Sequence, residues 1–372
     1  MHVYPRKTQT QALNRCACLA ELTQHEVAHV MEQIGLSLFD APSLKTALDI
    51  DWGDAEQKQQ ALQRLGDELD ALQTWIGEPV PVELKQPPLT AAVETLHLIM
   101  AQDLEPTPTG GGTQIREGVA KDRQISIEDE EMRHGRKSSA KRFDGYKRHI
   151  ARDIDEQLIL AAETLPANTP DTAGVDPLLV AVERQHREVT SLHIDRGYLG
   201  DPLINTYDEA GVVIVCKPWP VRNSAGHFSK QDFQIDLETL QATCPAGQVI
   251  PITPGKTACF PADGCRVCAL RSQCTSRESG GRTLAIHPQE DLLQRLSILP
   301  TTTEGRAALR ERVAVEHGLA HVSQRQGNQA RYNGTRKNTC HLRLVCAIQN
   351  LERAQALSEQ AQSDELPQRL AA

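Results

Sequence analysis

The stretch Val189-Thr190-Ser191-Leu192-His193-Ile194-Asp195-Arg196-Gly197-Tyr198-Leu199-Gly200 decides how this chain folds. Its first half is rich in β-branched and apolar residues, which predicts a strand over residues 188–194. The strand ends at Asp195, and the two glycines that follow predict a turn. Ligands of open α/β sheets bind at the carboxyl ends of strands, so Asp195 is a candidate ligand-binding carboxylate. A strand-terminal Asp near Gly is equally typical of a turn or a helix cap, and that interpretation stays open.

The segments around this stretch alternate between strand and helix patterns. Residues 143–153 alternate like an amphipathic strand, and residues 158–166 follow as a more apolar strand. Helices are predicted over 176–185 and 201–210, and a buried strand over 211–216. Strands connected by helical crossovers indicate an α/β sheet.

The remaining segments suggest several regions. Helical periodicity is present over residues 8–38, 55–76 and 89–101. Residues 105–140 contain prolines, consecutive glycines and many charges, which is typical of a mobile linker. The chain is therefore divided into a helical segment 1–104, a flexible basic linker 105–142, the first part of the core 143–227, a Cys-rich insertion 228–285, the second part of the core 286–353 and a disordered tail 354–372.

Composition indicates a soluble, helix-rich protein. The 372 residues are 39% hydrophobic and 3% aromatic. The chain contains no run of eighteen apolar residues, so no transmembrane helix is expected. The N-terminus leads into no apolar signal segment, so a cytoplasmic location is expected. The net charge of −9 is unevenly spread, because bases dominate residues 133–152 and 306–353 while acids dominate 36–105. Such basic blocks favour DNA as partner, although a solvated charged face is the plainer alternative.

Glu316 is a second candidate carboxylate. It lies in a predicted helix over residues 305–319, with Arg312 one turn earlier at a spacing that allows an ion pair. An ordinary surface pair would have the same spacing. Beyond this helix a basic, aromatic-interrupted, glycine-containing segment fits phosphate-backbone contacts, followed by an apolar helix to residue 351. The predicted DNA-contacting residues are Lys147, Arg148, Arg196, Arg312, Arg325, Arg331, Arg336 and Lys337.

Cysteines give a separate signal. Ten are present in a compartment expected to be reducing, where metal binding is favoured over disulfides. Cys265 and Cys268 form a CxxC pair, and Cys244 and Cys274 flank it, a pattern typical of a structural zinc site. Cys259 is the alternative ligand, and free thiols are the plainer interpretation. The remaining cysteines that lie in helical patterns are interpreted as small core residues: Cys16, Cys18, Cys340 and Cys346.

Four blocks together resemble the DDE transposases of bacterial insertion sequences: Asp144-Gly145-Tyr146-Lys147-Arg148-His149, Ile194-Asp195-Arg196-Gly197-Tyr198, Val315-Glu316-His317-Gly318 and Arg331-Tyr332-Asn333-Gly334-Thr335-Arg336-Lys337. The resemblance covers residues 43–353. It implies a ribonuclease-H-like fold in which two Asp and one Glu bind two divalent cations, usually Mg²⁺. Asp195 matches the second Asp, and Glu316 matches the Glu on the helix after an inserted domain.

The implied reaction is cleavage and joining of phosphodiesters in double-stranded DNA. Two metal ions about 4 Å apart would stabilise the attacking and leaving oxygens together. The implied partners are the ends of the insertion sequence, target DNA and a second copy of the chain, at the nucleoid of the cytoplasm and with no membrane contact.

The first Asp of the family pattern is missing. No Asp-Ser/Ala-Thr block precedes the helices, and the upstream alternatives are Asp49 and Asp51 in an acidic connection, or Asp144 on the next strand. The simplest explanation is a truncated copy without its first catalytic strand, which predicts an inactive fragment. A non-catalytic DNA-binding or regulatory protein and a different two-metal nuclease of the same fold are the alternatives.

Overall fold

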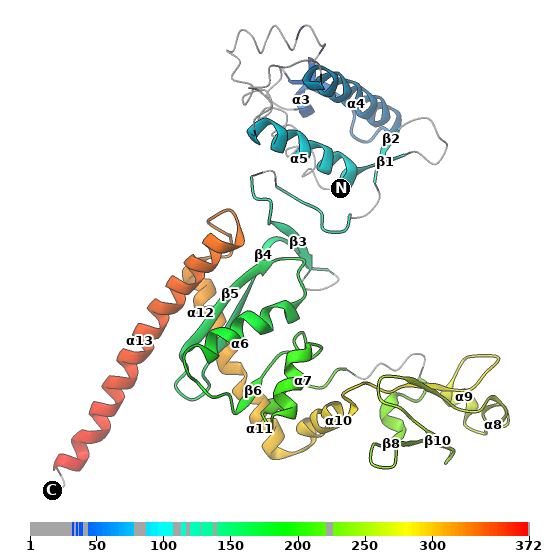
Figure 1. The fold of residues 1–372 in the computed structure, drawn as a ribbon, viewed down its shortest axis with the longest axis vertical. Helices are drawn as coiled ribbons and strands as arrows, with labels where there is room; N and C mark the ends of the chain where they lie inside the picture. Colours follow the sequence, from blue (N-terminus) through cyan, green and yellow to red (C-terminus); the bar gives the residue numbers. More distant parts are fainter. Residues whose placement is uncertain are drawn as a thin grey trace. The chain divides into compact units, whose positions relative to one another are not determined.

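The computed structural model describes residues 32, 35, 37–39, 44–77, 87–106, 113–116, 120–126, 128–136, 140–220 and 226–370 (Figure 1). Its strands and helices confirm the predicted α/β class. The chain divides into two compact units. Unit 1 comprises Met1–Arg148, Thr164–Thr169 and Asn328–His341, and unit 2 comprises His149–Glu163, Pro170–Gly327 and Leu342–Ala372. The predicted helix over residues 8–38 lies almost entirely outside the described residues.

Unit 1 contains the predicted helices of the first hundred residues. They are α3 (Leu44–Leu48), α4 (Ala55–Gly77) and α5 (Pro87–Asp103), so helices 55–76 and 89–101 are confirmed within two residues at each end. The carboxylate of Asp54 accepts the backbone N–H groups of Glu56 at 2.8 Å and Gln57 at 3.2 Å, which fixes the start of α4. This cap explains why the helix begins directly after an acidic connection.

Glu68 of α4 is an acidic residue that faces the interior. Its side chain is buried, and it accepts hydrogen bonds from the Ser37 hydroxyl at 2.8 Å and the Leu38 backbone N–H at 2.9 Å. Both donors belong to the short 3₁₀ helix η1 (Ser37–Phe39). A buried carboxylate must be satisfied by such donors, and here it anchors η1 on α4.

The expected linker 105–142 contains regular structure. Strands β1 (Leu104–Pro106) and β2 (Thr113–Ile115) pair antiparallel, and β3 (Arg133–Arg136) pairs antiparallel with β4 (Arg142–Arg152). The carboxylate of Asp129, just before β3, accepts the Tyr146 hydroxyl at 2.5 Å and the Gly334 N–H at 3.1 Å. Contacts with residues distant in sequence therefore order a segment whose composition predicts a linker.

The central sheet has the order β3-β4-β5, with β5 at Ile159–Pro166, in agreement with the two predicted strands. Ala161 and Ala162 are neighbours in β5 and so face opposite sides of the sheet. Ala161 packs with Leu178 and Val182 of α6 (Val175–Glu183). Ala162 belongs to a second cluster with Val322 and Leu342, from helices α12 and α13 described below. Helices thus cover both faces of this sheet (Figure 1).

A second, parallel sheet carries the candidate site. It consists of β6 (Ser191–His193) and β7 (Val213–Val215), joined by α7 (Pro202–Glu209). Asp201 caps α7 by accepting the Leu203 N–H at 2.8 Å. Ile214 and Cys216 are buried together with Leu296 from α10 (Glu290–Ile298). The predicted strand–helix–strand order over 188–216 is therefore observed.

Residues 228–286 form a small group of strands with their own apolar core. One sheet has the order β10-β9-β8 (Val249–Pro251, Gln241–Thr243, Gln234–Asp236), and the other pairs β11 (Thr257–Cys259) with β12 (Thr283–Ala285). The short segments η4 (Lys230–Asp232), α8 (Ala262–Arg266) and α9 (Arg271–Cys274) complete the group. Phe233, Ala242 and Phe260 are buried at its centre.

The C-terminal third is helical. After η5 (Leu299–Thr301) come α11 (Thr303–Glu311) and α12 (Val313–Gln326), which meet at Arg312 where one helix over 305–319 was expected. Helix α13 runs from Thr335 to Leu370, so residues 354–370 extend a helix where a disordered tail was expected. Strong helix formers such as Ala, Gln, Glu and Leu fill that segment and explain the extension. None of the described helices is long and apolar enough to cross a membrane.

Candidate functional site

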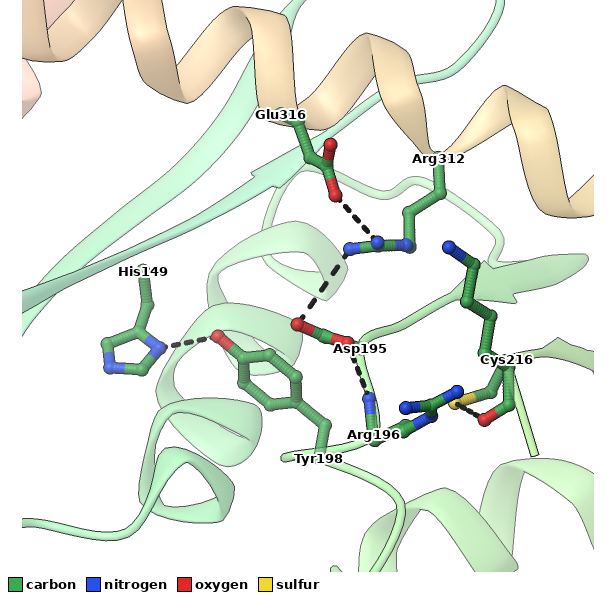
Figure 2. A network of polar contacts seen from close by, with 8 residues as sticks. His149, Asp195, Arg196, Tyr198, Cys216, Arg312 and Glu316 are labelled. Carbon is green, nitrogen blue, oxygen red and sulfur yellow. Dashed lines mark hydrogen bonds and ion pairs between the residues drawn. The ribbon is translucent and has the colours of Figure 1, made fainter. Parts of the chain in front are cut away.

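Asp195 lies just beyond the end of β6, as predicted (Figure 2). Ile194 donates its N–H to the Val215 carbonyl at 3.0 Å, which holds the connection against the end of β7. The Asp195 carboxylate accepts the Arg196 N–H at 2.8 Å, and its carbonyl accepts the Tyr198 N–H at 3.0 Å. Asp195 thus belongs to a tight turn, yet 63% of its side chain remains exposed. A turn role and a ligand role are therefore compatible at this residue.

Glu316 lies in the first turn of α12, where the helix dipole favours a negative charge. Its carboxylate accepts a charge-assisted hydrogen bond from Arg312, with 2.6 Å between Oε1 and Nη2. The other terminal nitrogen of Arg312, Nη1, lies 3.9 Å from Oδ2 of Asp195. One guanidinium therefore brings together two carboxylates that are far apart in sequence (Figure 2).

As placed, the two carboxylates do not fit a pair of bound divalent ions. Mg²⁺ requires oxygen ligands in near-octahedral arrangement about 2.0–2.1 Å from the ion, whereas here a guanidinium lies between the acids. No group of three or more His, Cys, Asp or Glu side chains in the described part of the chain is arranged to hold a metal ion. The structure thus brings Asp195 and Glu316 into one network, and the part of the chain that it describes adds no third acid in coordinating range.

Several residues of this network were not singled out from the sequence. His149 of β4 is buried, and its Nδ1 lies 2.5 Å from the Tyr198 hydroxyl. Burial raises the pKa of Tyr198, with further increases from the charges of Asp171 and Asp195. Burial likewise raises the pKa of the Cys216 thiol, to about 11, and the charge of Asp195 adds to it. His149 and Tyr198 lie in two of the family-like blocks, but only tertiary packing brings His149 and Cys216 to the turn after Asp195.

The predicted DNA-contacting residues differ in availability. Arg196, Arg331, Arg336 and Lys337 are exposed. Arg325 is ion-paired with Glu352. Arg148 is half-buried, and desolvation lowers its pKa. Only 18% of the Arg312 side chain is exposed.

Lys147 lines a basic pocket of about 520 Å³ within unit 1. Its ammonium donates to the Thr169 carbonyl at 2.9 Å. The other cationic side chains of the lining are Lys121, Arg123 and Arg136, of which Arg123 is paired with Asp103 at 2.8 Å. Arg136 is exposed. This pocket was not predictable from the sequence, because Lys147 meets lining residues from separate segments, 120–123, 134–136 and 167–168.

Four thiols gather around a cavity of about 420 Å³ in the 228–286 group: Cys244, Cys265, Cys268 and Cys274. The Cys244 sulfur accepts the Gln248 N–H at 3.3 Å, within a turn that contains Gly247. Burial raises the pKa of the Cys274 thiol; Arg282 opposes this, and the other three thiols reinforce it. Cys259 is exposed and does not line the cavity. These four are the predicted zinc ligands, but among the described residues they do not form a coordinating group.

The other cysteines divide. Cys346 is buried in the core, as predicted, whereas Cys340 is exposed, which corrects its interpretation as a core residue. Both lie on α13. Helical periodicity alone could not show that residue 340 faces solvent. Cys16 and Cys18 lie outside the described residues.

The alternatives for the first Asp have other roles. Asp51 accepts the Gly53 N–H at 2.8 Å in the turn between α3 and α4, and Asp49 lies in the same connection with a positive φ of 39°. Asp144 is paired with His134 of β3, with 2.6 Å between Oδ1 and Nδ1. The carboxylates of Asp51 and Asp144 therefore each have a structural partner close by.

Comparison with known proteins identifies one family. Residues 243–355 match the family model described as "Transposase DDE domain", a segment that contains Glu316 and the four gathered thiols but not Asp195. No curated protein and no solved structure matches the chain. The match supports the resemblance to DDE transposases predicted from the sequence: residues 243–355 of this chain are similar to their DDE domain.

Proposed function

We propose that this chain is a DNA-binding protein derived from an insertion-sequence transposase, with a ribonuclease-H-like core, and that it does not cut DNA by itself. DDE transposase domains generally use divalent metal ions such as Mg²⁺ on DNA. The observation that carries the proposal is the Asp195–Arg312–Glu316 network in a chain that matches this domain. Two acids of the expected three are together, and an arginine lies between them.

The distribution of cationic side chains supports DNA as the partner. The basic pocket around Lys147 and the exposed side chains of Arg331, Arg336 and Lys337 provide two cationic surfaces within unit 1. Lys and Arg contacts to phosphates supply most of the sequence-independent affinity for DNA and weaken as salt rises. Binding to the ends of an insertion sequence and pairing with a second transposase chain belong to the same proposal.

DNA binding is tested by fluorescence anisotropy with a labelled duplex at several salt concentrations. We expect log Kd to depend linearly on log salt, and the slope to fall by about one for each phosphate contact removed. Arg336→Ala should lower the slope, whereas Arg148→Ala, at a half-buried position, should lower it less. An affinity that does not respond to salt would contradict DNA binding through phosphates.

Catalysis is tested by nicking of supercoiled plasmid with Mg²⁺ or Mn²⁺. We expect no nicking above a metal-free control. Metal-dependent nicking that Asp195→Ala abolishes would show an active enzyme and would overturn the inactive part of the proposal. Nicking that survives Asp195→Ala would instead point to a contaminating nuclease.

We also propose a structural zinc ion held by Cys244, Cys265, Cys268 and Cys274. Support comes from the shared cavity and from the N–H···S bond to Cys244, since such bonds stabilise a thiolate ligand. Four thiolates would leave no open coordination position, so the zinc would be structural rather than catalytic. Elemental analysis of protein purified without added metal should give one zinc per chain, and clearly less would contradict this proposal.

A further inference from the structure

Arg312 has an unusual position among the charged groups of the candidate site. It lies at the junction of α11 and α12, and its backbone carbonyl accepts the N–H groups of Val315 at 3.0 Å and Glu316 at 3.4 Å. These bonds fix the residue at the start of α12 instead of leaving it on a free loop. Its guanidinium points between the two carboxylates (Figure 2).

Burial makes this arginine depend on the two acids. Its side chain is 18% exposed, while the side chains of Asp195 and Glu316 are 63% and 55% exposed. A mostly buried guanidinium requires compensating negative charge, whereas exposed carboxylates can also be compensated by water and solvent ions. The arginine therefore gains more from the pair than the carboxylates do, and its removal from between them would be unfavourable.

A divalent metal ion would meet positive charge at this site. Asp195, Arg196 and Arg312 lie around Cys216 at the end of β7 (Figure 2). A divalent ion entering between Asp195 and Glu316 would meet the positive charge of Arg312, and it would have to displace the Arg312–Glu316 hydrogen bond of 2.6 Å.

We propose that Arg312 is the built-in counter-ion of Asp195 and Glu316, and that it keeps divalent metal ions out of this pair in the DNA-free protein. The inference concerns the acids named in the proposed function, but it rests on the geometry of Arg312 and not on any catalytic activity. Arg312 acts here as a positioning residue, since it fixes both carboxylates and occupies the space that an ion would take.

The test measures Mn²⁺ binding to the full chain without DNA, by electron paramagnetic resonance and calorimetry. Wild-type protein should show no Mn²⁺ site that depends on Asp195. Arg312→Gln removes the charge and should tighten Mn²⁺ binding about tenfold or more, because the two acids become uncompensated. Arg310→Gln is the matched control: it removes the same charge from an exposed position two residues away and should leave Mn²⁺ binding unchanged.

Two double variants locate the new site. In Arg312→Gln combined with Asp195→Asn, or with Glu316→Gln, the gain in Mn²⁺ affinity should disappear. Arg312→Lys covers the case in which Arg312→Gln does not fold, because lysine keeps the charge but lacks the planar guanidinium fork that holds both carboxylates in a fixed geometry. It should give a smaller gain, about threefold.

Three results would overturn the inference. One is a Mn²⁺ site in the wild type that Asp195→Asn removes. Another is equal Mn²⁺ affinity in the wild type and the folded Arg312 variants, and the last is a gain in Mn²⁺ affinity that persists in the double variants. DNA affinity is measured on the same samples. If the wild type does not bind DNA, the proposed function is wrong. The comparison of Mn²⁺ affinities would still decide the role of Arg312.

Discussion

His149 Nδ1 and the Tyr198 hydroxyl lie 2.5 Å apart, and their rings meet edge to face with centroids 5.8 Å apart. This contact links strand β4 to the turn that follows Asp195 (Figure 2). Gly174 packs against the same imidazole, where an added Cβ would lie 3.0 Å from the ring. The position of Asp195 therefore depends on a strand that lies more than forty residues earlier in the sequence.

Removing the Tyr198 hydroxyl should loosen this turn. Tyr198→Phe keeps the ring packing but leaves a buried imidazole nitrogen without this partner, which should cost about 1–3 kcal/mol of unfolding free energy. Urea denaturation measures the loss. Tyr332→Phe, at a tyrosine that is 47% exposed, is the control and should change stability by less than about 0.5 kcal/mol. Equal effects of the two changes would contradict a structural role for the His149–Tyr198 contact.

Gly305 should tolerate no side chain. A Cβ at this position would lie 2.2 Å from the backbone oxygen of Leu299, and backbone cannot move aside as a flexible side chain can. We expect Gly305→Ala to cost about 1–3 kcal/mol by forcing α11 away from η5. Thermal denaturation tests this, with Gly200→Ala as control because nothing lies within 4 Å of a Cβ there. A Gly305→Ala protein as stable as the control would refute the close approach.

Acid should weaken the anchoring of α13. Hydrogen bonds from the Thr335 side chain and its backbone N–H, the latter at 2.7 Å, lower the pKa of Glu131 below its ordinary 4.5. A lowered folded-state pKa means that the stabilisation is present above the unfolded value and is lost as pH falls through the folded value. Because Glu131 is exposed, the contribution should be about 0.2–1 kcal/mol.

The comparison of wild type with Glu131→Gln isolates this contribution. The variant should be less stable at pH 7, and the difference should shrink as pH falls below 4.5. Urea denaturation at a series of pH values provides the measurement. A difference that stays constant across the series would show that the charge of Glu131 is not involved.

The gathered thiols should respond differently from Cys259. If the four thiols hold zinc, Cys268→Ser should destabilise the 228–286 group by more than about 3 kcal/mol and expose it to proteolysis, and a strong chelator should do the same to wild type. Cys259→Ser should have little effect, because that thiol is exposed and away from the cavity. Equal protease sensitivity of both variants and of chelated wild type would argue against a metal-stabilised group.

Much of the fold follows from the sequence alone. Apolar periodicity located α4, α5, β4, β5 and the strand–helix–strand unit that ends at Asp195 and Cys216, because each pattern reflects which side of one element faces the core. The four sequence blocks that resemble DDE transposases pointed to that family, and the family-model match over residues 243–355 supports it. The spacing of the cysteines selected the four that share a cavity.

The tertiary structure decided what local patterns cannot encode. Burial of Glu68, order in the expected linker and the exposure of Cys340 and Cys259 all depend on contacts with residues distant in the chain. The same holds for Arg312, whose pairing with Glu316 is a local helical spacing but whose approach to Asp195 is not. Sequence periodicity reports one element at a time, whereas the balance of charge at a site is set by where separate elements meet.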